Sequence, residues 1–235
     1  MVLSPYARDP SPLSSATPGG VQGGASTLAI VWPCPLDVKT YAAAGRDVAV
    51  PRPDCPSCQR PMTFWSGYDR AALGDDECRI WIRRAKCEPC AAGHALIPSF
   101  LLIRRLRVVD TIGMALALMV RGSPARAVAR RIGVALSTVR DWWRRFGARA
   151  RWLQVVGLAV VVTLGRAVPR LSADPAAAAL EAVAAGWDAL RLRLGAATPG
   201  LWPTLSLITG GTALATTTSP RYSGLAQIGW MPATS

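Results

Sequence analysis

Two pairs of cysteines with C-x-x-C spacing constrain the fold of this 235-residue chain more than any other feature. The first pair is Cys55 and Cys58, and the second is Cys87 and Cys90. Each C-x-x-C turn lets two thiolates reach one ion, and two such turns complete the tetrahedral set of soft ligands that Zn²⁺ prefers. We therefore predict one structural zinc ion per chain, held by these four cysteines.

The segment between the two cysteine pairs predicts a β-hairpin. Met62–Trp65 and Cys78–Arg83 have the β-branched and aromatic composition of strands, and the second segment alternates between apolar and basic residues. Gly74-Asp75-Asp76 supplies a turn between them. A hairpin with two C-x-x-C knuckles is a zinc ribbon, and Leu28–Trp32 adds a short strand before it.

The other potential ligands are expected to lie outside the metal site. Cys34 and Cys78 have strand-like, apolar surroundings and are predicted to be small buried residues. His94, four residues after Cys90, is the alternative ligand that the spacing leaves open. Four cysteine ligands leave no coordination position for water, so a catalytic zinc site is not expected.

The charge of the chain indicates an acidic partner. The formal net charge is +13 and the pI is near 10.7, which favours nucleic acid first and an anionic membrane surface second. Nine arginines lie between Arg121 and Arg151, where Asp141 is the one acid. The apolar run at 152–165 is shorter than the ~18–20 residues that a bilayer requires, so no membrane span is expected.

The segment after the second cysteine pair has the pattern of a helix-turn-helix. We predict a first helix from an N-cap at Asp110 to Arg121, a second that Ser123 caps, and a third that starts near Leu136. Gly133 permits the turn between the second and third helices. The apolar residues that would form their shared core, with Ala129 at the helix crossing, are Val128, Ala129, Ile132, Val139 and Trp142.

The third helix of this module would be the recognition helix, whose N-terminal turns enter the major groove. We expect Ser137, Thr138 and Arg140 to contact base edges, and Arg131, Arg144 and Arg145 to contact phosphates. Asp141 is expected either to accept a hydrogen bond from cytosine or to orient a neighbouring arginine, Arg140 or Arg144. Ala135 precedes the helix, so its first turn lacks a side-chain cap. The alternative is an ordinary three-helix core with an arginine-rich exposed face.

Two further helices are predicted after Arg151. An apolar helix covers about Trp152–Val168 and ends at Pro169, and a second helix opens at Asp174-Pro175. The second helix carries a heptad seam made of Leu180, Val183, Trp187, Leu190 and Leu194. The seam packs either on the preceding apolar helix, which we prefer, or on a second copy in a homodimer.

These features divide the chain into five parts and predict a small α+β zinc ribbon followed by a mainly α helix-turn-helix bundle and C-terminal helices. The expected parts are a disordered leader (1–26), a zinc ribbon with an N-terminal strand (27–100), the helix-turn-helix (101–151), a C-terminal helical pair (152–197) and a poorly defined tail (198–235). The leader shows no secretory signal. We therefore expect a cytoplasmic location, where paired cysteines bind metal rather than form disulfides.

With these motifs in place, the chain resembles the N-terminal, DNA-binding half of bacterial insertion-sequence transposases. It resembles more closely an uncharacterised bacterial family that joins a zinc ribbon to a helix-turn-helix and is often linked to mobile elements. The stretches that carry the resemblance lie within Ile30–Arg151 and are Cys55–Cys58, Ile82–Cys87, Ala95–Phe100 and Ser137–Trp142. The resemblance implies binding of double-stranded DNA, as a transposon accessory factor or a transcriptional regulator.

The distribution of acids argues against strand-transfer catalysis by this chain. Such catalysis needs three acids that converge on two Mg²⁺ ions. After Asp141 the sequence has only Asp174, Glu181 and Asp188, all within one short helical region. We expect no enzyme activity, and any catalysis would come from a separate transposase or integrase chain. The alternative function is a structural or adaptor protein that uses the zinc ribbon and the Leu180–Leu194 seam for protein contacts.

Overall fold

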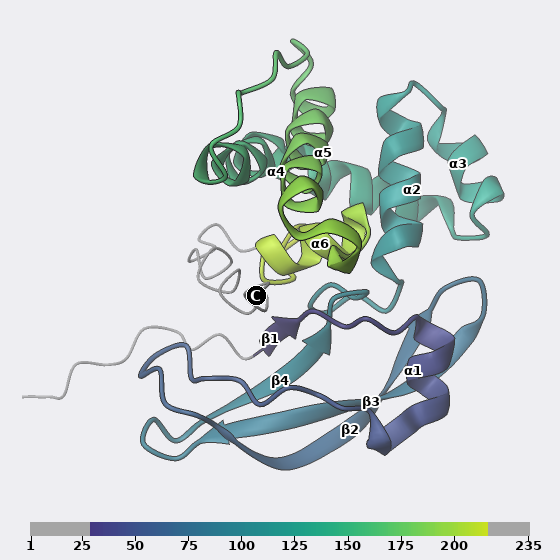
Figure 1. Cartoon of the computed structure of the whole chain (residues 1–235). Coiled ribbons are helices and arrows are strands. Elements are labelled where there is room, and N and C mark those ends of the chain that lie inside the picture. The colour runs from purple at the N-terminus through teal and green to yellow at the C-terminus, as the bar shows by residue number, and fades with distance from the viewer. Residues whose placement is uncertain (1–28, 216–235) are drawn as a thin grey trace, which may run out of the picture.

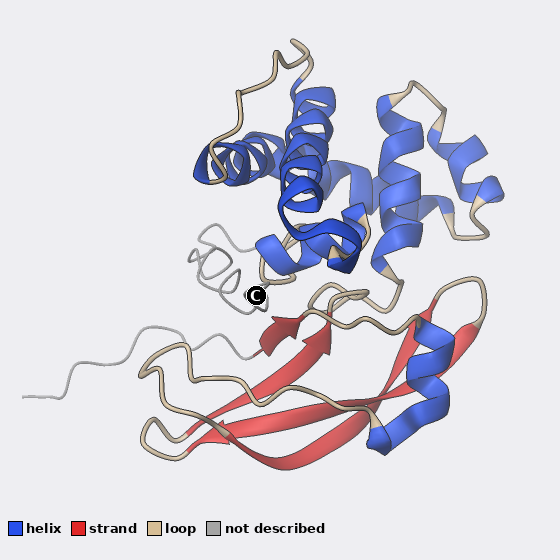
Figure 2. Ribbon diagram, in the orientation of Figure 1, coloured by secondary structure: helices blue, strands red, loops and turns tan. Residues whose placement is uncertain are grey.

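The computed structural model describes residues 29–215. The expected leader (1–26) and the end of the expected tail (216–235) lie outside the described residues. Figures 1 and 2 show a four-stranded sheet with α1 against its strands, while α2 to α6 gather at the edge of the sheet where β1 lies. The described chain has one buried cluster in the sheet part and another among these five helices.

The sheet has the order β1-β4-β3-β2. Its strands are β1 (Ala29–Trp32), β2 (Thr63–Leu73), β3 (Glu77–Cys87) and β4 (Ala92–Pro98); β1 and β4 are parallel, and the other neighbours are antiparallel. The hairpin around 74–76 is confirmed, but both of its strands are longer than predicted, because the pairing continues through charged residues up to Leu73 and Glu77. The sequence prediction missed β4, whose apolar run is short and flanked by Gly93 and Pro98.

Helix α1 (Val38–Ala44) is a second element that the sequence prediction missed. Asp37 caps it by accepting hydrogen bonds from the amide and the hydroxyl of Thr40, at 2.9 and 2.8 Å. The pairing of β4 with β3 covers Arg84–Cys87 only, and α1 packs beside the remainder of β3. There the buried Tyr41 donates its hydroxyl to the carbonyl of Trp81 at 3.0 Å. The helix therefore satisfies a strand carbonyl that β4 does not reach.

The first two helices of the helical part begin close to their predicted starts, α2 two residues earlier and α3 one residue later. Helix α2 (Val109–Val120) has Val108 at its N-cap, so Asp110 lies in the first turn and is not the cap. Helix α3 (Ala125–Arg131) has Pro124 at its N-cap, and Ser123 makes no capping bond there. Both helices therefore start on extended backbone without a side-chain cap, and packing of their apolar faces fixes them instead.

Helix α4 (Leu136–Thr163) is one continuous helix of 28 residues where the sequence predicted two. The predicted boundary at Arg151 lies within the helix. The composition changes there from arginine-rich to apolar, but no proline or positive-φ glycine interrupts the backbone, so the change marks a new environment and not a new element. The helix ends before Gly165, at φ +65°, and not at Pro169. By length and composition α4 could span a membrane, yet it forms the centre of the helical cluster.

Helix α5 (Pro175–Leu194) begins at the predicted Asp174 cap, which accepts from the amide of Ala177 at 2.8 Å, and ends at Gly195 with φ +64°. It packs on the apolar half of α4 within the same chain. Small residues make this contact close: a Cβ on Gly186 would lie 2.9 Å from the carbonyl oxygen of Gly157. Of the predicted seam, Val183 and Leu190 are buried in the helical cluster.

Helix α6 (Leu201–Ile208) lies in the segment predicted to be a poorly defined tail, and it joins the two parts of the molecule. Leu207 is buried in the sheet cluster, whereas Leu205 and Ile208 are buried in the helical cluster. The hydroxyl of the buried Ser206 donates to the carbonyl of Leu101 at 2.6 Å. The prediction was therefore wrong for 198–215, where a short apolar helix is stabilised by contacts that the local sequence does not reveal.

Candidate metal centre and helix-turn-helix surface

The four cysteines of the two pairs come together at one end of the sheet. Cys55 and Cys58 lie in the loop before β2, Cys87 ends β3, and Cys90 lies in the turn that leads to β4. Their Sγ atoms all lie within 4.8 Å of one another. The Sγ separations are 3.8 Å for Cys55 and Cys90 and 3.4 Å for Cys58 and Cys87. A tetrahedron with metal–sulfur bonds of about 2.3 Å has edges of about 3.8 Å, so the group can hold a metal ion.

The two cysteine pairs share one local backbone feature. The residue after each pair has a left-handed conformation although it is not glycine: φ is +58° at Gln59 and +51° at Ala91. In the first turn, the amide of Gln59 donates to the carbonyl of Cys55 at 2.9 Å. In the second turn, the amide of Ala91 donates to the carbonyl of Glu88 at 3.1 Å. Such conformations are uncommon for non-glycine residues, and both turns bend the chain so that two thiols face one point.

The thiols of the cluster affect one another's protonation. Burial acts to raise the pKa of Cys55, but the amides of Cys58 and Ser57 and the adjacent thiols outweigh it and lower the pKa to about 7. The pKa of Cys90 is raised to about 12 by its hydrogen bonds to Cys58 and Cys87 and by burial. The Cys55 thiolate therefore forms more readily than that of Cys90, and a bound cation would favour the thiolate form that metal ligation needs.

The remaining potential ligands lie outside this cluster, as predicted. Within residues 29–215 the group contains the four cysteines and no histidine. His94 is buried on β4, in the register position opposite Ala85. Cys34 is buried, and burial raises the pKa of its thiol to about 11. Cys78 is half-buried on β3.

Helices α2, α3 and the start of α4 lie where the sequence predicted the three helices of a helix-turn-helix, and they pack on one another. Gly133 adopts φ +65° in the connection between α3 and α4, where the amide of Val134 donates to the carbonyl of Ala129 at 3.1 Å. Ala129, Val139 and the other predicted core residues pack in the helical cluster, with Ile132 only partly buried. Ala135 is the N-cap of α4 and provides no side-chain bond, as predicted.

The structure separates the predicted DNA contacts into exposed and half-buried groups. Arg131, Ser137, Arg140 and Arg144 are exposed, whereas Thr138 and Arg145 are half-buried. The separation follows the helix period, because Val139 and Trp142 turn the opposite face of α4 into the core. The exposed members therefore lie on the solvent side of the first three turns of α4 and at the end of α3.

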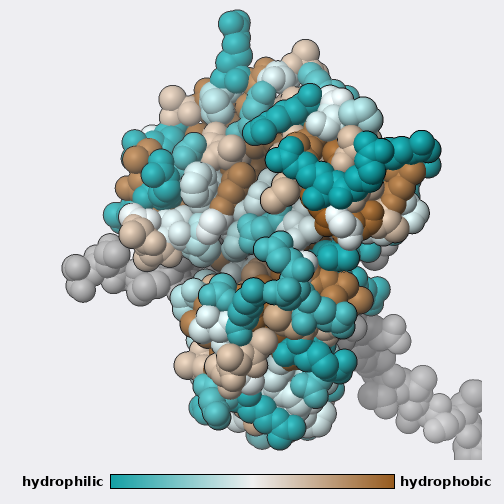
Figure 3. Space-filling view, turned by 90° about the vertical axis from the view of Figure 1, so that its right-hand side faces the viewer, coloured by the Kyte–Doolittle hydropathy of each residue, from teal (hydrophilic) through white to brown (hydrophobic). Residues whose placement is uncertain are grey.

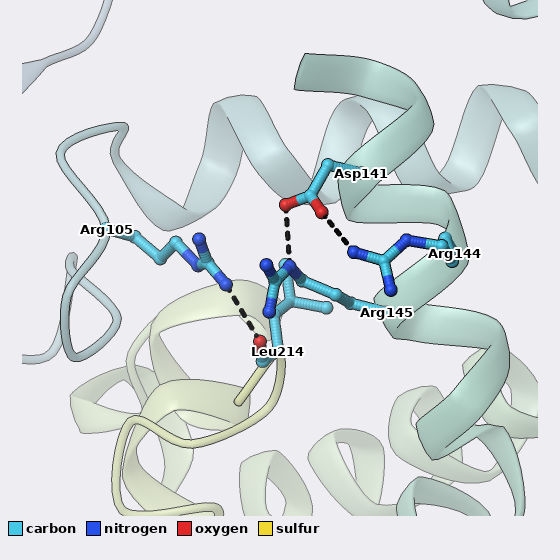
Figure 4. Close-up of polar contacts among 5 residues, drawn as sticks. All are labelled: Arg105, Asp141, Arg144, Arg145 and Leu214. Carbon is cyan, nitrogen blue, oxygen red and sulfur yellow. Dashed lines mark hydrogen bonds and ion pairs between the residues drawn. The ribbon is translucent and has the colours of Figure 1, made fainter. Parts of the chain in front are cut away.

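Asp141 forms ion pairs with Arg144 and Arg145, two of the residues that were predicted to contact phosphates (Figure 4). It accepts from Arg144 and from Arg145, each at 2.6 Å. These hydrogen bonds, the one from Arg145 first, lower the pKa of the Asp141 carboxyl. The side chain of Arg145 is 19% exposed, compared with 69% for Arg144. Asp141 thus orients Arg144, as one of the predicted alternatives proposed, and additionally anchors Arg145 against the protein.

Other arginines of this region have structural contacts that the sequence did not reveal. Arg149 is buried; its guanidinium donates to the carbonyl of Thr212 at 3.3 Å and lies 4.2 Å from the ring centroid of Trp152. Arg105 donates to the carbonyl of Leu214 at 3.0 Å (Figure 4). Both arginines bind the segment after α6.

Seven arginines of the 121–151 stretch remain exposed: Arg121, Arg126, Arg130, Arg131, Arg140, Arg144 and Arg151. Figure 3 shows long hydrophilic side chains projecting from the helical part.

Comparison with protein families shows one relation. The chain carries, at residues 55–142, a match to the family described as a domain of unknown function (DUF6431). The matched segment begins at Cys55 and ends at Trp142, so it contains both cysteine pairs, α2, α3 and the first turns of α4. Searches of curated proteins and of solved structures found no match. The cysteine cluster, α2, α3 and the first turns of α4 thus lie in one matched segment, whose function is uncharacterised, whereas Arg144 and Arg145 follow it.

Proposed function

We propose that this protein is a zinc-stabilised DNA-binding protein that reads the major groove of double-stranded DNA with the N-terminal part of α4. The observation that carries the proposal is the exposed polar and basic side of that helix. Ser137, Arg140 and Arg144 point to solvent, while α2 and α3 hold the other side of the helix. A helix presented in this way by two supporting helices matches the geometry of helix-turn-helix readers.

The contacts are divided as follows. Ser137, Thr138 and Arg140 lie on the first turns of α4 and contact base edges. Arg131 and Arg144 contact phosphates. Arg145 was expected to be a third phosphate ligand, but its bond to Asp141 and its low exposure assign it mainly to positioning.

Zinc is the metal that we propose for the cysteine cluster. Four cysteine thiols with Sγ atoms within 4.8 Å of one another supply the ligand set of closed, structural zinc sites. The cluster ties the loop before β2 to the ends of β3 and β4, in a sheet part that is small and needs such a link. No ligand position remains for a reacting water, which agrees with a non-catalytic role.

For the cellular role we propose a transcriptional regulator or an accessory factor of a mobile element in the cytoplasm. This rests on the resemblance to transposase N-terminal halves, and catalysis would then belong to a separate transposase or integrase chain. The adaptor alternative loses one of its two surfaces, because Val183 and Leu190 of the Leu180–Leu194 seam are buried within the chain.

The proposal is tested by selection of bound sequences from a random duplex pool with zinc-loaded protein, followed by affinity measurements at several salt concentrations. We expect Arg144→Ala to reduce the slope of log K against log salt by about 0.9, the value for one lost phosphate contact. We expect Arg140→Ala to relax the base preference at one position, by about 1–3 kcal/mol.

The matched control is a charge reversal elsewhere on the surface. Arg144→Glu and Arg193→Glu change the charge equally, but Arg193 is an exposed residue of α5. We expect strong loss of duplex binding for the first variant and only a small electrostatic loss for the second. Equal losses, or no salt-sensitive retention of duplex by zinc-loaded wild type, would refute the assignment of α4 as the reading element.

A further inference from the structure

One face of the β2–β3 hairpin, close to the cysteine cluster, carries exposed aromatic side chains. Trp65 is 55% exposed and Tyr68 is 40% exposed, and they are the aromatic members of the exposed large apolar residues within 29–215. The other aromatic residues of the hairpin, Trp81 and Phe64, are half-buried, with the guanidinium groups of Arg46 and Arg83 over their respective rings. Two exposed rings on one strand indicate a surface that contacts something else.

The strand register places two cations on the same face. Ser66 lies opposite Arg84 and Thr63 opposite Lys86, with the irregularity of the pairing at Trp65. Tyr68 lies opposite the buried Ile82, and because alternate residues of a strand share a face, both lie on the side of Arg84 and Lys86. The guanidinium of Arg84 lies 5.0 Å from the centroid of the Trp65 ring. We call Trp65, Tyr68, Arg84 and Lys86 the hairpin face.

The charges of the hairpin face are positive. Lys86 is exposed and Arg84 is half-buried. The nearest acid along β2, Asp69, is adjacent to Tyr68 and therefore points to the other side of the strand, where its register partner is Trp81. Arg84 covers one side of the Trp65 ring by a cation–π contact, and the exposure of that ring leaves room for a second flat group.

We propose that the hairpin face binds single-stranded DNA, with bases stacked on Trp65 and Tyr68 and phosphates at Arg84 and Lys86. Aromatic rings beside cations suit a single strand, because its unpaired bases offer their flat faces and its backbone needs positive partners. A duplex is excluded from this mode, since its bases are stacked on each other. The choice of DNA over RNA rests on the proposed function, whereas the binding of a single strand rests on the hairpin face alone.

The experiment measures fluorescence anisotropy of labelled oligo(dT), oligo(rU) and a duplex with the full-length, zinc-loaded protein. Base–aromatic stacking is worth about 1–3 kcal/mol per base, so Trp65→Ala should weaken oligo(dT) binding by about 5- to 150-fold. Tyr68→Ala is a second variant with the same expectation. Arg84→Gln should also weaken oligo(dT) binding. Its matched control is Arg79→Gln, which removes an exposed cation from the opposite face of β3 and should leave oligo(dT) binding unchanged.

The duplex distinguishes this proposal from the preceding one. We expect Trp65→Ala to leave duplex affinity unchanged and Arg144→Glu to abolish it while retaining oligo(dT). Oligo(dT) binding that survives both Trp65→Ala and Tyr68→Ala overturns the hairpin face and leaves the role of α4 intact. Tighter binding of oligo(rU) than of oligo(dT) overturns the assignment to DNA. Zinc content and far-UV circular dichroism equal to wild type establish that each variant is folded.

Discussion

The contact between α4 and α5 depends on the missing side chain of Gly157. A Cβ added there would lie 2.7 Å from the backbone nitrogen of Val183, and closer still to the carbonyl group of Ala182. These are backbone atoms of a helix, so no side chain can rotate away. Carbon atoms normally approach to about 3.5 Å, and Gly157→Ala would therefore push α5 away from α4 by about 1 Å.

The cost follows from a comparison with Gly147, which lies on the same helix. A Cβ on Gly147 would have nothing within 4 Å, so Gly147→Ala should gain the ordinary helix-propensity benefit of about 1 kcal/mol. Gly157→Ala gains the same benefit but adds the overpacking cost, about 1–3 kcal/mol. The difference between the two variants therefore isolates the clash and should lie near 1–3 kcal/mol, with Gly157→Ala the less stable.

Urea denaturation of the zinc-loaded variants, followed by far-UV circular dichroism, measures this difference. Equal slopes of unfolding free energy against urea would show that both variants unfold the same structure. If Gly157→Ala is as stable as Gly147→Ala, then the close approach of α4 and α5 is incorrect.

Three other perturbations have defined outcomes. Leu190→Asp should destabilise the helical part by more than about 3 kcal/mol, because it buries an unpaired charge. The control Leu192→Asp lies at a site 64% exposed and should leave the melting temperature nearly unchanged. Equal melting temperatures for the two variants would contradict the packing of α5. Cys87→Ser should abolish the zinc content measured by mass spectrometry and the dispersion of the hairpin amide signals in NMR spectra, while the signals of the helical part largely remain. Hairpin amide signals that stay fully dispersed in this variant would argue against a structural metal. The lowered pKa of Asp141 means that its pair with Arg145 stabilises the protein above the ordinary carboxyl pKa and is lost as pH falls through the folded-state pKa. Asp141→Asn should therefore flatten the stability curve at acidic pH, by less than about 1 kcal/mol because the pair is solvent-screened, and an unchanged pH profile would refute the pairing.

The local features of the fold followed from the sequence where one residue type determines the geometry. The four cysteines were identified by spacing, and the structure brings their Sγ atoms together. Gly133 and Gly195 end helices at positive φ, as glycine permits. These predictions succeeded because each depends on a few adjacent residues.

Features that depend on contacts distant in sequence were missed. Nothing in the sequence near Tyr41 shows that its hydroxyl would meet a strand carbonyl of Trp81. The apolar half of α4 was separated from the basic half because composition changed at Arg151, although the backbone continues. Arg145 was predicted to contact phosphate, but it pairs with Asp141 four residues before it. Residues four apart lie on the same side of a helix, so the sequence is compatible with both a salt bridge and a shared DNA-facing surface.

The continuity of α4 has a mechanical consequence. The residues that we propose for DNA contact and the site of α5 packing lie on one continuous helix, with Arg140 and Gly157 about 25 Å apart along its axis at 1.5 Å per residue. A tilt of about 10° imposed at the Gly157 end would displace the other end by about 4 Å, close to the rise of one base pair. If α4 contacts DNA as we propose, its packing on α5, which is remote from the nucleic acid, would set the register of that contact.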